Sequence, residues 1–326
     1  MHVHEFTNKT EWTEKKSFLQ SWEYGDFLLS LGRNVKRSSY KTDEGIVQVQ
    51  RIDIALPFGR KATYIPHAEI SDEALSLLLD ELKKEKYVFV RLELLHGLNH
   101  ISYTSIRAIN RQPQHTWVLP IQNSMDKLYA EMHKKTRYNI RLAQRKGVEI
   151  KEESDFDTFW TLNAETVKRQ EYTSLPKNYL EKVLTLPTVK QFTAYYEGVA
   201  LASAITIAHK DILYYIMGAS TEKHRAIMAP YALHDHIIQY AQTQGFKQYD
   251  FWGTAAPIAK EQAHAQCFHH YCWDNTHPLA GVARFKAGFG GYSYSHPTAQ
   301  EVILSPLYFW IYKTYQRIRG AKISGQ

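Results

Sequence analysis

The sequence predicts a mixed α/β protein built from a module that occurs twice. The chain has 326 residues, a length that suggests about two domains. Segments with the period of amphipathic helices alternate with short apolar segments typical of strands. The two halves contain a similar mixture of both, and no low-complexity linker separates them. Together these observations favour two α/β modules in tandem.

Helices and strands alternate in the first half. Ser21 can cap a helix that Gly32 ends, and Ser71 can cap a second helix whose apolar face is rich in leucine. The expected elements are a helix at 21–32, a strand at 47–54, a helix at 71–86, strands at 87–94 and 115–121, and one helix from Ser124 to Gly147.

The second half repeats this mixture. A helix with proline near its first position begins at about Ala229 and ends at Gly245. The expected elements are a strand at 148–151, helices at 156–170 and 176–184, strands at 189–197, 201–209 and 212–218, a helix at 229–244, a strand at 248–252 and a last helix at 307–319.

Composition limits the compartment and the partners. The net charge of +7 permits a polyanionic partner without establishing one. Cys267 and Cys272 make no disulfide framework, which fits a reducing compartment. No secretory signal is visible, and no apolar run approaches the length of a membrane span. A cytoplasmic protein is therefore expected.

The helix that begins at Ser124 becomes strongly basic. Arg137, Arg141 and Arg145 follow one another at four-residue spacing and share one helix face. Such a stripe repels itself unless something negative neutralises it, and phosphate is the obvious candidate. A solvated face paired with acids from elsewhere remains equally open. The candidate phosphate-binding residues are Lys134, Lys135, Arg137, Arg141 and Arg145.

A lysine between two phenylalanines precedes a cluster of glycines. Phe285 and Lys286 are followed by Gly288, Gly290 and Gly291. Glycine permits tight turns and close approach of other groups, so a lysine held here would be partly desolvated. The alternative is a glycine-rich turn that carries a lysine in solvent.

The last predicted helix, at 307–319, is aromatic and basic. It could lie at a membrane interface, so a peripheral membrane contact is possible. Packing against the protein itself is the favoured interpretation, because its aromatic residues occur nearly all round the helix.

Five segments in order resemble the Fem family of peptidoglycan bridge aminoacyltransferases. The resemblance spans residues from about 15 to 320. The segments are FLQSWEYG at 18–25, HKKTRYNIR at 133–141, GAS at 218–220, YDFWG at 249–253 and HPLAGVARFKAGFGG at 277–291.

This resemblance implies two GNAT-like acyltransferase domains in tandem. The first would be residues 1–150, joined by a returning C-terminal helix at 296–326, and the second would be residues 151–295. The family's optional coiled-coil arm is not expected, because the sequence has no sustained heptads.

The resemblance also implies the reaction. Members move an amino acid from aminoacyl-tRNA to an amine of the peptidoglycan precursor stem peptide, which forms the interpeptide bridge. Lys286 would stabilise negative charge, and the carbonyl of Phe285 would orient the attacking amine. No cofactor is implied.

Candidate substrate contacts also come from the resemblance. Relatives place an acidic residue where Glu93 stands, although aspartate is commoner there, and Arg91 lies on the same side of that strand. Arg169 lies in the helix that contacts precursor phosphates in relatives, and Tyr215 borders the cleft. For Tyr215 and Asp250, core packing and strand capping remain open as alternatives.

Three other possibilities follow from the residues. An acyl-CoA-dependent N-acyltransferase would share the fold, but residues 222–230, which enter a helix, contain no glycine for a pyrophosphate loop. A non-catalytic RNA-binding protein could use the basic stripe. Histidines surround the two cysteines, but their spacing matches no standard zinc pattern, so no metal site is expected.

Overall fold

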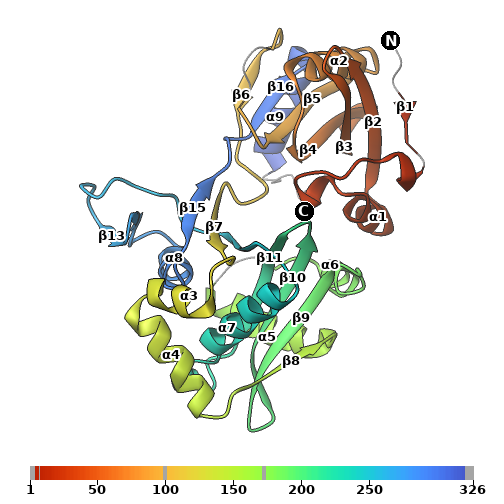
Figure 1. The fold of residues 1–326 in the computed structure, drawn as a ribbon. Coiled ribbons are helices and arrows are strands. Elements are labelled where there is room, and N and C mark those ends of the chain that lie inside the picture. The colour runs from red at the N-terminus through yellow and green to blue at the C-terminus, as the bar shows by residue number, and fades with distance from the viewer. Residues whose placement is uncertain (1–3, 7, 98–100, 171–173, 320–326) are drawn as a thin grey trace. The chain divides into compact units, whose positions relative to one another are not determined.

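The computed structural model describes residues 4–6, 8–97, 101–170 and 174–319. It is a mixed α/β structure, as the sequence predicts. Residues 1–114 and 296–326 form one compact unit, and residues 115–295 form a second (Figure 1).

The first unit is built on a mixed sheet. Its strands β2, β3 and β4 form an antiparallel meander, and β5 then pairs parallel to β4 after a helical crossover. In spatial order the strands are β1 (His4–Glu5), β2 (Asn34–Thr42), β3 (Gly45–Leu56), β4 (Arg60–Ala68), β5 (Tyr87–Leu94), β16 (Gln300–Ile303) and β6 (Ser105–Arg107).

Three α-helices pack on this sheet. Helix α1 (Trp22–Ser30) is capped by Ser21, and α2 (Asp72–Lys84) is capped by Ser71. Leu75, Leu78, Leu79 and Leu82 of α2 are fully buried, because they form one face of the helix. The last helix, α9 (Pro306–Arg319), packs on β5, which confirms the returning C-terminal helix.

The second unit repeats the plan. Strands β9, β10 and β11 form an antiparallel meander, and β12 pairs parallel to β11 after helix α7 (Ala229–Thr243). In spatial order its strands are β15 (Tyr292–Ser295), β7 (His115–Pro120), β12 (Gln248–Gly253), β11 (Ile212–Ser220), β10 (Val199–His209), β9 (Val189–Tyr196) and β8 (Glu149–Glu153).

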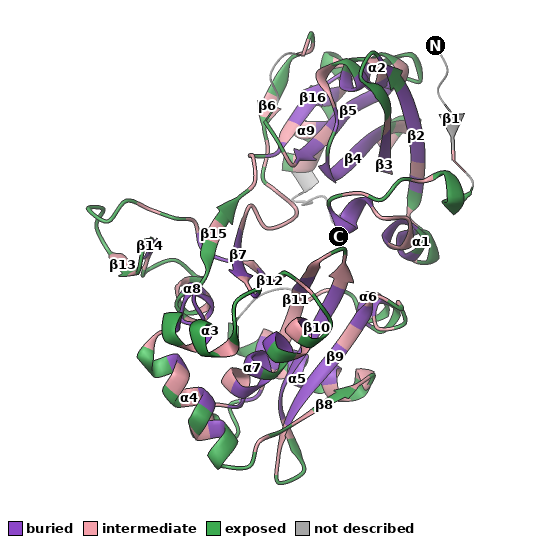
Figure 2. Ribbon diagram, viewed as in Figure 1, coloured by how far each residue is buried: buried purple, intermediate pink, exposed green. Residues whose placement is uncertain are grey.

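The two units therefore share one topology. Each has a three-stranded meander, a crossover helix and a parallel strand, in the same chain order. This repeat confirms the prediction of a mixed α/β module that occurs twice. The second unit adds α5 (Phe156–Gln170) and α6 (Lys177–Val183), and the central strands of both sheets are buried (Figure 2).

The units divide earlier along the chain than expected. The sequence placed a boundary at about residue 150, whereas the second compact unit begins at residue 115. Strand β7 pairs with β12 and β15, and α4 (Lys134–Arg145) packs on α7, so residues 115–150 make their contacts in the second unit.

The single basic helix expected from Ser124 to Gly147 is two helices. Helix α3 (Met125–Glu131) ends at Met132, whose ψ of 150° is extended. His133 then caps α4, because its Nδ1 accepts a hydrogen bond from Lys135 N at 3.1 Å.

The cysteines correct another expectation. Cys267 and Cys272 form a disulfide across the hairpin of β13 (Ala265–Phe268) and β14 (Tyr271–Asp274). They are direct partners in the strand register, with Cα atoms 4.0 Å apart. The short turn thus brings together two cysteines that were not expected to form a disulfide.

In the part of the chain that the structure describes, no helix is long and apolar enough to cross a membrane.

Candidate functional site

The end of strand β12 is irregular. The register to β7 shifts between Asp250 and Gly253, and Trp252 adopts a left-handed φ of 62°. A carboxylate oxygen of Asp250 accepts a hydrogen bond from Trp252 N at 2.7 Å and so holds this conformation. This backbone conformation is energetically unfavourable for a bulky residue. Residues in such conformations cluster at functional sites.

Lys286 contacts this irregular strand end. Its Nζ donates to Phe251 O at 2.7 Å and to Gly253 O at 2.5 Å. The side chain is only 6% exposed, so the alternative of a lysine in solvent is wrong. The lysine lies on helix α8 (Ala280–Ala287) and not in the glycine turn, which follows it with Gly290 and Gly291 at left-handed φ values.

Burial changes the titration of two facing groups. Desolvation lowers the pKa of Lys286 to about 7, and the negative charge of Asp250 opposes this shift. Desolvation likewise raises the pKa of Asp250 to about 7, opposed by the hydrogen bond from Trp252 N and by the charge of Lys286. The pair can therefore gain or lose a proton near neutral pH, as acid–base chemistry requires.

An aromatic cluster lies beside Lys286. His234 of α7 is buried and its Nδ1 shares a hydrogen bond with the hydroxyl of Tyr249 at 2.9 Å. Its ring packs against Tyr215 at 4.6 Å, Phe251 at 5.1 Å and Phe285 at 5.3 Å. Desolvation lowers the pKa of His234 to about 3, so the imidazole is neutral.

Sequence reasoning missed His234. Its signal was a histidine within the apolar face of a predicted helix, beside Leu233, Ile237 and Ile238. That pattern gives no hint that the ring meets Tyr249 and Phe285, which come from other segments of the chain.

Tyr215 lies beside the lysine. The centre of its ring is 5.7 Å from Lys286 Nζ, within the range of a cation–π contact. Its hydroxyl occupies the space above Gly218, where a Cβ would come within 1.6 Å of the phenolic oxygen. A side chain at Gly218, the glycine of the GAS segment, would therefore collide with Tyr215.

The carbonyl of Phe285 lies near the end of α8. In a regular α-helix the amide of Phe289 would donate a hydrogen bond to the carbonyl of Phe285. Here it donates instead to Lys286 O at 3.1 Å. This tightened helix end leaves the Phe285 carbonyl for another donor.

The basic residues of α4 divide into two kinds. Arg137 donates to the carbonyls of Tyr129 at 3.0 Å and Met132 at 2.5 Å, so it caps the end of α3. The remaining candidates are exposed, and no acid pairs with them within the described residues. They are Lys134, Lys135, Arg141 and Arg145.

Arg91 and Glu93 belong to the first unit and are engaged internally. Glu93 is buried and accepts hydrogen bonds from the Tyr64 hydroxyl at 2.8 Å and Arg111 N at 2.5 Å. Desolvation raises its pKa. Arg91 pairs with buried Glu301 at 2.5 Å.

Arg169 contacts the C-terminal end of strand β11. Its guanidinium donates to Ser220 O at 2.9 Å and lies 3.3 Å from a carboxylate oxygen of Glu222. It is partly exposed, so it can still meet a ligand from the solvent side.

The histidine-rich segment lies between Gly253 and Gly281, within the described residues. No group of three or more histidine, cysteine or acidic side chains there is arranged to hold a metal ion. The disulfide also removes both thiolates as ligands.

Comparison with known proteins identifies relatives. The family model described as FemAB matches residues 80–186 and 185–317. The aminoacyltransferase FemB of Staphylococcus epidermidis is 29% identical over 126 residues, which are 37% of this chain and only 25% of FemB.

Solved structures match along most of the chain. The crystal structure of FemX has a TM-score of 0.73 at 17% identity and covers 95% of this chain and 100% of its own. L-PGS from Bacillus licheniformis has a TM-score of 0.52 at 14% identity and covers 96% and 100%. At these identities the two structures show a shared fold.

Proposed function

Because this chain belongs to the FemAB family, we propose that it is a peptidoglycan bridge aminoacyltransferase. It takes an amino acid from aminoacyl-tRNA and joins it to an amine of the precursor stem peptide. The observation that carries this proposal is Lys286, which is buried and held against the carbonyls of Phe251 and Gly253. It lies inside the segment that the family model matches.

The reaction converts an ester into an amide. The amine nitrogen attacks the aminoacyl carbonyl, a C–N bond forms and a negative oxygen develops. The C–O bond to the ribose then breaks, the ribose oxygen takes a proton, and the nitrogen loses one. The enzyme must stabilise the oxygen and help to move the protons.

Lys286 supplies the stabilising charge. A protonated lysine has three N–H donors, and two of them are used by Phe251 O and Gly253 O. The third is available to the developing oxygen of the substrate. Because the two carbonyls fix the nitrogen, little reorganisation is needed during the reaction.

Phe285 and Asp250 have supporting roles. The Phe285 carbonyl, which the Phe289 amide leaves unoccupied, accepts a hydrogen bond from the attacking amine and orients its lone pair. Asp250 keeps the end of β12 in its irregular conformation through Trp252 N. It is therefore a positioning residue for Lys286.

The exposed basic residues of α4 fit the tRNA backbone. Lys134, Lys135, Arg141 and Arg145 provide unpaired positive charge on one helix, which suits phosphate. Arg169 and Tyr215 are assigned to the precursor, whereas the contacts of Arg91 and Glu93 inside the first unit do not favour that role for them. The reaction is placed in the cytoplasm, where aminoacyl-tRNA is found.

The test is a transfer assay with a mixture of labelled aminoacyl-tRNAs. Each is offered with the nucleotide-linked and with the lipid-linked precursor. We expect label in the precursor from aminoacyl-tRNA but not from acyl-CoA. Saturation with acyl-CoA would instead indicate the N-acyltransferase. Equal binding of charged and uncharged tRNA without transfer would indicate an RNA-binding protein.

The role of Lys286 is tested separately. Lys286→Met keeps an apolar stem in the buried space, so the protein should remain folded, and its rate of transfer should fall by about two to three orders of magnitude. A folded Lys286→Met protein with a normal rate would contradict the assigned role and leave the family function intact.

A further inference from the structure

Helix α9 has two dissimilar faces. Phe309 and Tyr312 are buried against Phe89, with ring centres 5.5 and 5.7 Å away. On the outer side Leu307 is 69% and Trp310 is 54% exposed. The helix contains no acidic residue. It therefore packs on the first unit through one face and presents large apolar side chains to solvent through the other.

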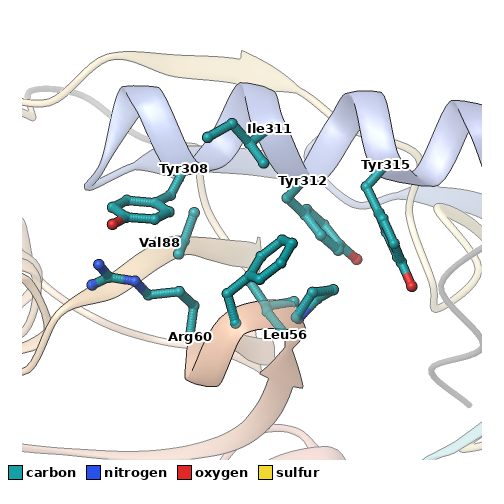
Figure 3. Close-up of a pocket in the computed structure, with 9 residues that line it drawn as sticks. Leu56, Arg60, Val88, Tyr308, Ile311, Tyr312 and Tyr315 are labelled. Carbon is teal, nitrogen blue, oxygen red and sulfur yellow. The ribbon is translucent and has the colours of Figure 1, made fainter.

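A second element adds to this exposed surface. Phe58 lies in the short turn Pro57–Gly59 with a left-handed φ of 61°, and its side chain is 77% exposed. Phe58, Ile311 and Tyr315 line the same groove between the turn and α9. Figure 3 shows tyrosines of α9 pointing from the helix toward this turn.

The edge of this surface is positively charged. The Arg60 guanidinium lies over the Tyr308 ring, 3.7 Å from its centre (Figure 3). Arg317, farther along α9, is exposed. In the described ranges of the chain, neither of these two cations forms an ion pair with an acid. The surface thus combines exposed apolar groups with uncompensated positive charge.

We propose that this surface rests on an anionic lipid bilayer. We call it the α9 surface and define it by Phe58, Leu307, Trp310, Ile311, Arg60 and Arg317. The apolar side chains enter the boundary between headgroups and acyl chains, tryptophan occupies the interface it prefers, and the cations meet lipid phosphates. With 14 residues, α9 is too short to cross the bilayer and lies in its plane.

A second copy of the chain fits this surface less well. Four exposed apolar side chains are few for a stable interface, which buries about 800 Å² on each partner. A two-fold interface would also bring Arg60 and Arg317 of both copies into the same contact. A lipid surface supplies the opposite charge.

The test is sedimentation of the purified chain with vesicles. Vesicles of phosphatidylglycerol and phosphatidylcholine should carry it down, and vesicles of phosphatidylcholine alone should carry down much less. In the variant with Leu307, Trp310 and Ile311 all replaced by serine, binding to the anionic vesicles should fall at least about tenfold. The matched control replaces exposed Leu29 and Ile46 by serine and should bind normally.

Charge and depth are measured independently. Arg60→Gln with Arg317→Gln should weaken binding and its dependence on salt. The intrinsic fluorescence should shift to the blue with vesicles, and Trp310→Phe should reduce that shift. Normal binding of the triple serine variant to anionic vesicles would overturn the proposal. Self-association of the wild-type chain that is lost in this variant would also overturn it, because the surface would then be an interface between two copies. No substrate is present, so the result does not depend on the proposed function.

Discussion

The hydroxyl of Tyr215 fills the space above Gly218. A Cβ on residue 218 would lie 1.6 Å from this oxygen and 2.5 Å from the ring carbon that carries it. Tyr215 in turn packs on His234 and faces Lys286, so the glycine controls where the phenol stands beside the lysine.

Gly218→Ala should therefore displace the Tyr215 ring. We expect the rate of aminoacyl transfer to fall about tenfold or more, with a loss of stability of about 1–3 kcal/mol from overpacking. Steady-state transfer and urea denaturation measure the two effects. Gly281→Ala is the control, because a Cβ there meets nothing within 4 Å. Equal behaviour of the two variants would contradict the role of Gly218.

The buried lysine should make stability depend on pH. Native Lys286 releases its proton near pH 7, because its pKa is about 7, and the unfolded chain does so near 10.5. Between these values unfolding takes up a proton, so the native state gains stability as pH rises. Lys286→Met lacks this effect.

The unfolding free energy of the wild type minus that of Lys286→Met should thus increase between pH 7 and pH 9. The increase should be at most roughly 1.4 kcal/mol per pH unit. Urea denaturation at several pH values measures it, and equal m values show that one transition is compared. A difference that stays constant with pH would refute the shifted pKa.

Asp250 should be needed more for its hydrogen bond than for its charge. Asp250→Ala removes the acceptor of Trp252 N and should cost about 1–3 kcal/mol. Asp250→Asn keeps an oxygen acceptor and should cost less. Transfer should fall more in the alanine variant, because Phe251 and Gly253, whose carbonyls hold Lys286, flank Trp252. Chemical denaturation and the transfer assay compare them, and the reverse order of stability would exclude this role.

We expect the arginines of α4 to differ in function, one stabilising the fold and two binding tRNA. Arg137→Gln should reduce stability by about 1–2 kcal/mol, because it caps carbonyls at the end of α3. Arg141→Gln with Arg145→Gln should leave stability within about 0.5 kcal/mol but weaken tRNA binding. Filter binding at several salt concentrations should show a shallower slope, by about 0.7–0.9 per charge removed. Unchanged salt dependence would remove α4 from the tRNA contact.

The disulfide should matter little for stability. It closes a short loop, so the chain-entropy effect is about 2 kcal/mol or less. Tyr271 and Trp273 anchor the hairpin in the core independently. Replacing Cys267 and Cys272 by serine should lower the unfolding free energy by no more than this, and mass spectrometry with a thiol reagent checks the pairing. Global unfolding of the double variant would contradict this account.

The sequence predicts the regular elements well where one face is apolar. The bounds 156–170 agree with α5, and the leucines assigned to one face of α2 are buried. Strands β2 and β4 were not predicted, because buried polar groups interrupt the alternation. Arg37 and Gln50, for example, are buried and bonded to each other at 2.9 Å.

The site is harder to predict than the elements. Phe285 and Lys286 were recognised from a segment whose glycines suggest a turn, yet Ala283 and Ala287 are fully buried and the segment is helical. Tertiary packing outweighs the local preference here. The lowered pKa of Lys286 comes from burial that only the folded chain produces.

The two ends of the first unit have a consequence for synthesis. Strand β16 lies between β5 and β6, and His296 N donates to Gln114 O at 2.8 Å where the chain returns. On the ribosome, β5 emerges well before β16, and all of residues 115–295 are made in between. The second unit can therefore finish folding while β5 still presents an open edge.

A nascent chain that stops just after residue 295 would carry a finished second unit and an unfinished sheet. Its exposed β5 edge is a template for pairing with other chains, so such products should aggregate or be degraded. Strand β16 is the last strand to be synthesised. Completion of the first sheet therefore depends on the final part of the chain, which is made only after the whole second unit.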